Sequence, residues 1–127
     1  MPMPIKSLLK HKYKIIAFVY TLAVAYISLT PLDKYNLPDI DMGDKAVHLV
    51  LYLFLTLLWL MAYPELITIK KIYLGTIIAW GILIEFLQAF LVTGRSGDIF
   101  DALANTAGSI LGLYIYIHFR TFFKVSK

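Results

Sequence analysis

The chain has 127 residues, of which 60% are hydrophobic and 16% charged, and its formal net charge is +4. A chain of this length forms one domain, and a soluble core of that size would be too small to bury so much apolar surface. The composition therefore predicts an integral membrane protein. The absence of cysteine also excludes disulfides, thiolate catalysis and iron–sulfur sites.

Apolar segments along the chain predict four transmembrane helices. A basic tail over residues 1–14 leads into the first of them, and a signal peptide is the alternative interpretation of these two segments together. We interpret the apolar segment as an uncleaved span because it is long for a signal peptide and its small residues lie inside it. The expected spans are residues 15–31, 45–63, 72–93 and 99–119. The predicted fold class is thus all-α: a polytopic integral membrane protein, a four-transmembrane-helix bundle forming a single domain over residues 1–127.

The positions of the basic residues predict the orientation of these spans. Nine of the twelve lysines and arginines lie in the N-terminal tail, the connection after the second span and the C-terminal tail. The positive-inside rule therefore places both termini in the cytoplasm. The same positions argue against nucleic acid as a partner. Aromatic residues gather near the predicted inner interface, as an aromatic belt would: Tyr13, Trp59, Tyr63, Tyr73 and Tyr116.

With this topology, the unusual polar residues meet near the outer face. Stripes at helical spacing lie on the second span (Asp44, His48, Tyr52), the third (Gly81, Glu85, Gln88) and the fourth (Asp98, Asp101, Asn105, Gly108, Gly112). We expect these three spans to pack around a polar pocket that opens outwards. On the fourth span, the small residues Gly108 and Gly112 are expected to let a neighbouring helix approach closely.

Most of these polar residues also have a purely structural interpretation. Asp44 and Asp98 stand where helices are expected to begin, so each is typical of an N-cap, and Asp101 would complete a box-like cap after Asp98. The amides Gln88 and Asn105 are typical of hydrogen bonds between membrane helices. Arg95 could pair with phospholipid headgroups, and His48 near an interface is more often structural than a ligand.

Glu85 is different because it lies inside a span, away from the helix ends. Neither capping nor snorkelling explains a carboxyl group at that depth. It must either be paired, with Arg95, His48 or Lys45 as the candidates, or stay protonated. Either state suits a binding or acid–base role, and a buried network that fixes the register of the helices is the alternative.

In the order and spacing of these residues, the chain resembles the VanZ-like family of membrane proteins. The resemblance rests on Asp44-Lys45-x-x-His48-x-x-x-Tyr52, then Glu85-x-x-Gln88, then Arg95-x-x-Asp98-x-x-Asp101-x-x-Ala104-Asn105-x-x-Gly108-x-x-x-Gly112. It implies a small multi-pass protein of the bacterial cytoplasmic membrane. The family's namesake accompanies glycopeptide resistance, so the resemblance also implies a role in glycopeptide or teicoplanin resistance.

The polar residues support two functions of different classes. In the first, an envelope protein binds an outer-leaflet lipid, a lipid-linked phosphate or a glycopeptide-type compound through Lys45, Gln88, Arg95 and Asn105. In the second, a membrane enzyme acts on a lipid-linked envelope precursor, with Glu85 and His48 as acid–base groups and Asp98 and Asp101 as ligands of a divalent metal. No other cofactor is expected. The expected partners are membrane lipids, and the sequence leaves open whether the protein forms a homo-oligomer. Transport is a weaker third hypothesis, since four spans make a small pathway unless the protein oligomerises.

Overall fold

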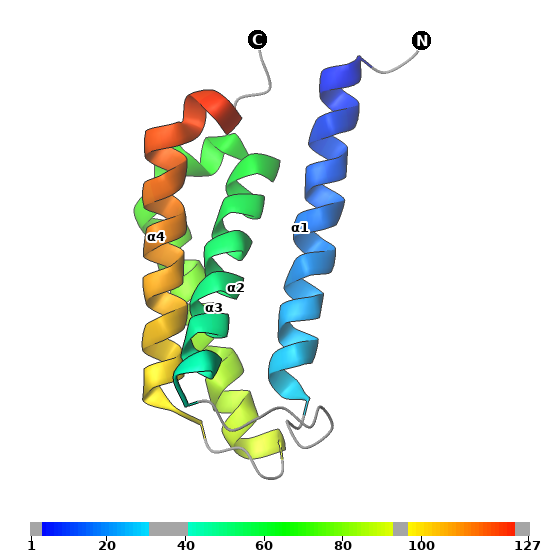
Figure 1. Cartoon of the computed structure of the whole chain (residues 1–127). Helices are drawn as coiled ribbons and strands as arrows, with labels where there is room; N and C mark the ends of the chain where they lie inside the picture. Colours follow the sequence, from blue (N-terminus) through cyan, green and yellow to red (C-terminus); the bar gives the residue numbers. More distant parts are fainter. Residues whose placement is uncertain (1–3, 31–40, 93–96, 124–127) are drawn as a thin grey trace.

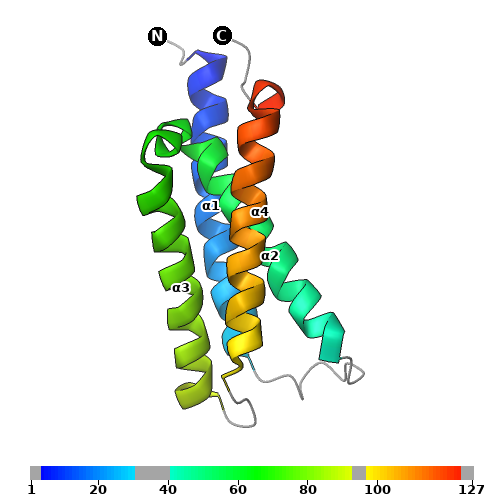
Figure 2. The same ribbon diagram turned by 90° about the vertical axis from the view of Figure 1, so that its left-hand side faces the viewer.

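The computed structural model describes residues 4–30, 41–92 and 97–123, which contain four long α-helices. They are α1 (Ile5–Leu29), α2 (Asp41–Ala62), α3 (Lys70–Leu91) and α4 (Ile99–Phe123), and a 3-10 helix, η2 (Pro64–Ile69), joins α2 to α3. The long helices run alongside one another, and α1 begins at the end of the bundle where α4 ends (Figure 1; Figure 2). We call this end the inner end and the opposite one the outer end, after the predicted topology.

Helices α1 and α4 are longer than the apolar segments from which they are predicted. Helix α1 begins at Ile5, so the prediction of a tail over residues 1–14 is wrong from that residue onward. At the other terminus, α4 continues past residue 119 to Phe123. Hydropathy detects the part of a helix that lies in hydrocarbon, whereas backbone hydrogen bonding continues into the interface, where lysine and arginine are good helix formers. The sequence predicts a connection between the first two spans over residues 31–43; residues 31–40 lie outside the described residues, and residues 41–43 belong to α2 instead.

Of the two predicted N-caps, Asp44 and Asp98, the structure supports one. Helix α2 begins at Asp41, so Asp44 lies one turn inside the helix and the prediction that it is an N-cap is wrong. Asp98 is confirmed as a cap, because its Oδ1 accepts a hydrogen bond of 2.9 Å from the backbone N–H of Phe100. The carboxyl group of Asp98 therefore already serves the first turn of α4.

Three segments are long and apolar enough to cross a membrane: Ser7–Leu29, Asp44–Ala62 and Pro64–Leu91. Helix α4 is not among them, because polar residues on one of its faces lower its hydropathy. Those residues, Asp101, Asn105 and Ser109, are buried inside the bundle, whereas its large apolar residues, such as Leu103 and Ile110, are exposed. At 25 residues and about 1.5 Å per residue, α4 exceeds the roughly 30 Å of a hydrocarbon core. The fold is a four-helix bundle of a polytopic membrane protein.

Helices α2 and α4 pack most closely, and two glycines permit the contact. A Cβ atom on Gly108 would lie 2.1 Å from the carbonyl oxygen of Leu49, and one on Gly112 would lie 2.7 Å from that of Leu53. Both distances are too short for any real Cβ contact. Gly108 and Gly112, which are expected to let a neighbouring helix approach closely, both lie against the backbone of α2.

Hydrogen bonds from aromatic side chains join the remaining helices to α2. The Tyr20 hydroxyl on α1 donates to the Leu51 carbonyl at 2.9 Å, and the Tyr73 hydroxyl on α3 donates to the Thr56 carbonyl at 2.8 Å. Trp59 on α2 donates its indole N–H to the Thr21 hydroxyl on α1 at 3.0 Å. These bonds link α1 and α3 to α2.

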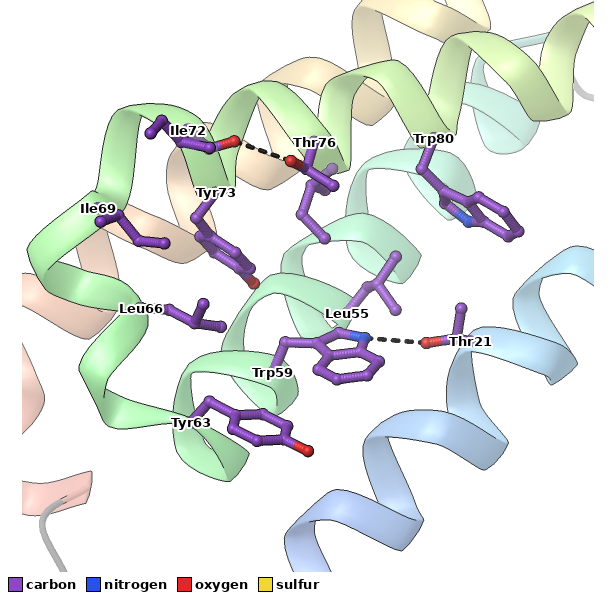
Figure 3. A pocket seen from close by; sticks show the side chains of 11 residues that line it. Thr21, Leu55, Trp59, Tyr63, Leu66, Ile69, Ile72, Tyr73, Thr76 and Trp80 are labelled. Carbon is purple, nitrogen blue, oxygen red and sulfur yellow. Dashed lines mark hydrogen bonds between the residues drawn. The ribbon is translucent and has the colours of Figure 1, made fainter.

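The inner half of the bundle holds an apolar groove of about 460 Å³ between α1, α2 and α3 (Figure 3). Its lining is almost entirely apolar and includes Leu55, Trp59, Tyr73, Ile77 and Trp80. Of the described residues, none with a charged side chain lines this groove. It suits hydrocarbon, such as a lipid chain.

The absence of cysteine makes the predicted orientation simple to test, because each introduced thiol is the only one in the chain. Ile99 at the outer end and Lys71 at the inner end are both exposed. We expect a membrane-impermeant maleimide to label Ile99→Cys in intact spheroplasts and to label Lys71→Cys only after permeabilisation. The reverse pattern would show that the outer end of the bundle faces the cytoplasm.

Candidate functional site

His48 is the centre of a polar cluster at the outer end of the bundle. It lies on α2 and is only 4% exposed. Its ring nitrogens face opposite sets of partners: Nδ1 faces Glu85 and Asn105, whereas Nε2 faces Asp44 and Asp101. We use the name polar cluster for the seven residues Asp44, Lys45, His48, Glu85, Asp98, Asp101 and Asn105.

On the Nδ1 side, three helices meet through one hydrogen-bonded group. His48 Nδ1 lies 3.0 Å from Asn105 Oδ1, and Asn105 Nδ2 donates to Glu85 Oε1 at 3.4 Å. Glu85 Oε1 is also 3.6 Å from His48 Nδ1. Asn105 and Glu85 are 1% and 6% exposed, so this group forms the buried floor of the cluster. Of the candidate partners for Glu85 that the structure describes, His48 is the one that lies beside it.

A small residue makes room for this contact between helices. Gly81 on α3 lies one turn before Glu85, and a Cβ atom there would approach Asn105 Cβ to 3.3 Å and the Tyr52 ring to 3.1 Å. The missing side chain therefore lets Asn105 and Tyr52 lie directly against α3. Since α3 comes this close, Glu85 can reach a histidine on α2 and an asparagine on α4 at once.

On the Nε2 side, two carboxylates approach the imidazole without a hydrogen bond to it. Asp44 Oδ1 is 3.8 Å and Asp101 Oδ2 is 3.9 Å from His48 Nε2. Asp101 is only 7% exposed, and its Oδ1 has no hydrogen-bond partner among the described residues. Asp101 is expected to complete a capping box at the start of α4. Its carboxyl group points instead towards His48 on α2.

The rim of the cluster is partly exposed and contains the lysine of the cluster. Lys45 Nζ lies 3.4 Å from Asp98 Oδ2, and the two side chains are 33% and 37% exposed. Asp98 thus divides its oxygens between the cap of α4 and Lys45. The cluster is therefore graded from a buried floor of His48, Glu85 and Asn105 to a rim where Lys45 and Asp98 are partly exposed.

The other residues predicted for the site lie elsewhere or outside the described ranges. Gln88 turns towards α1, where its Nε2 donates to the carbonyl oxygen of Ser28, so it does not join the polar cluster. Arg95 lies outside the described residues. For the metal, sequence reasoning pairs Asp98 with Asp101, whereas the described geometry groups Asp101 with Asp44 and His48.

The sequence analysis places Asp44 on one stripe with His48 but gives it no catalytic, binding or metal role, because taken alone it is typical of an N-cap. Asp44 and His48 are four residues apart on one helix, so their side chains lie on the same face. Only the rotation of α2 against α4, which the glycine contacts determine, shows that this face meets Asp101.

These features define a class: a polytopic helical membrane protein with a buried His–Glu–Asn group at one end of its bundle. The chain matches the VanZ/LLP1 family over residues 4–122, and it belongs to that family. The match includes α1, which the motif residues do not reach. No curated protein and no solved structure matches the chain.

Proposed function

We propose that this protein binds the polar headgroup of an outer-leaflet lipid or lipid-linked envelope precursor in the polar cluster. The observation that carries the proposal is the burial of His48, Glu85 and Asn105 at one point of three membrane helices. Ionisable groups at such positions are costly, and they mark binding sites or polar pathways in membrane proteins. We place the headgroup at the rim, where the side chains of Lys45 and Asp98 are partly exposed.

The charge of the cluster sets a condition on the ligand. Its described residues include four carboxyl groups, Asp44, Glu85, Asp98 and Asp101, against Lys45 and His48. A phosphate therefore needs more positive charge than Lys45 supplies, either from Arg95 or from a bound cation. A glycopeptide-type compound, with the resistance role that the family's namesake implies, is a further candidate ligand for the same rim.

The test is the lipid that stays with the protein through gentle purification, identified by mass spectrometry of the extract. We expect a phosphate-bearing lipid on the wild type and a loss of about 10- to 100-fold in Lys45→Ala, since a charge-assisted hydrogen bond contributes about 1.5–3 kcal/mol. Lys71→Ala, at the inner end, is the matched control and should keep the lipid. Equal retention by all three proteins would remove Lys45, and with it the rim, from the binding site.

A second candidate function is catalysis on the same bound precursor. The contact of 3.6 Å between Glu85 and His48 favours it, because a carboxyl group beside an imidazole is a common acid–base arrangement. Moreover, Glu85 Oε2 has no hydrogen-bond partner among the described residues. Release of phosphate from a polyprenyl diphosphate by the wild type, absent in Glu85→Gln, would favour the enzyme over a binding protein.

A further inference from the structure

The hydrogen bonds around His48 determine which of its ring nitrogens carries the proton. Asn105 donates through Nδ2 to Glu85, so its Oδ1 is the atom directed at His48 Nδ1, 3.0 Å away. An amide oxygen only accepts hydrogen bonds, so this network assigns the proton to Nδ1. In the neutral ring, Nε2 then has a free lone pair.

That lone pair faces two carboxylates, an arrangement that is repulsive unless something positive lies between them. The distances of 3.8 Å to Asp44 and 3.9 Å to Asp101 are both too long for hydrogen bonds. One ligand atom from each of the three residues lies within 4.8 Å of the others. Asp101 adds an independent sign, since its side chain is nine-tenths buried and its Oδ1 has no hydrogen-bond partner among the described residues.

We propose that His48 Nε2, Asp44 and Asp101 bind a divalent transition-metal ion of the zinc or manganese type. One imidazole with two carboxylates suits these ions, whereas magnesium and calcium prefer oxygen ligands alone. With bonds of about 2.0–2.2 Å, the three ligand atoms would move inwards from their present separations. Asn105 is the positioning residue, because a hydrogen bond at the other ring nitrogen orients a metal-binding histidine.

The ion would also supply the charge that the proposed function lacks. It would offset the excess of carboxyl groups in the polar cluster, and coordination positions towards the rim would stay open to a headgroup oxygen. Only the binding of a headgroup oxygen by the ion rests on the proposed function. The metal site itself follows from the three side chains and can be measured alone.

The test is a titration of the full chain in detergent, stripped with a chelator, with ZnCl₂ and with MnCl₂ by calorimetry. We expect one site per chain, at least about 100-fold weaker in His48→Gln and Asp101→Asn and about 10- to 100-fold weaker in Asn105→Ala. Asp98→Asn is the matched control, because it removes a neighbouring carboxylate but keeps a good N-cap. His118→Gln controls for an exposed histidine at the inner end. Circular dichroism checks that each variant is folded.

Two outcomes would overturn the metal site: no stoichiometric binding by the wild type, or an equal loss in Asp98→Asn and Asp101→Asn. The second would show a general effect of negative charge. Lipid retention by the stripped wild type separates this inference from the proposed function. Retained lipid without metal binding contradicts the ion alone, whereas metal binding without any lipid contradicts headgroup binding and supports the ion.

Discussion

Gly108→Ala should destabilise the bundle by about 1–3 kcal/mol, the usual cost of forcing an extra methyl group into a packed contact. The new Cβ would lie 2.1 Å from the carbonyl oxygen of Leu49, and that atom belongs to the backbone of α2. A flexible side chain could rotate away, but here the whole helix must shift. The shift would also separate His48 on α2 from Asn105 on α4, so bound lipid should be lost as well. Unfolding in a denaturing detergent, followed by circular dichroism, measures the change in stability.

Gly75→Ala is the control for the glycine substitution itself. Gly75 lies on α3, and a Cβ atom there would meet nothing within 4 Å. Because alanine has a higher helix propensity than glycine, this variant should be as stable as the wild type or more stable by up to about 1 kcal/mol. If Gly108→Ala were as stable as Gly75→Ala, the close contact between α2 and α4 would be contradicted.

Glu85→Gln is expected to abolish ligand binding and leave the bundle folded. Glutamine has almost the same shape, and its amide oxygen can still accept the hydrogen bond from Asn105. What is lost is the carboxyl group beside His48. Glu85→Leu should instead lower the free energy of unfolding by about 1–3 kcal/mol, since it leaves the buried Nδ2 group of Asn105 without its Glu85 acceptor.

Glu65→Gln is the matched control for the loss of a carboxyl group. Glu65 lies in η2 at the inner end, is exposed, and pairs only loosely with Lys10 at 3.9 Å. It should keep both stability and ligand. A Glu85→Gln protein that binds ligand like the wild type would reduce Glu85 to a residue that holds the helices in register.

The bundle and the composition of its polar cluster could largely be predicted from the sequence, because both depend on helical spacing. Asp101, Asn105 and Gly108 lie on one face of a helix whatever its neighbours are, and so do Asp44 and His48. The glycine pair then identified a close helix contact, although not that α2 is the partner. Hydropathy predicted a span within each of the four long helices, and three segments of the described residues are long and apolar enough to cross a membrane.

What the sequence could not predict depends on how each helix is rotated and where it begins. Gln88 shares a stripe with Glu85, yet its amide reaches the Ser28 carbonyl on α1, which only the position of α1 determines. Asp44 and Asp98 both resemble caps, but α2 begins three residues before Asp44. One aspartate is thereby placed beside His48, whereas the other does cap α4.

Native mass spectrometry of the gently purified chain, wild type beside Glu85→Gln, tests the binding of a headgroup in the polar cluster most directly. We predict that the wild type carries a phosphate-bearing lipid and that the equally folded Glu85→Gln protein does not. A wild type without any lipid, or the same lipid at the same occupancy on both proteins, would contradict a binding site centred on Glu85 and His48.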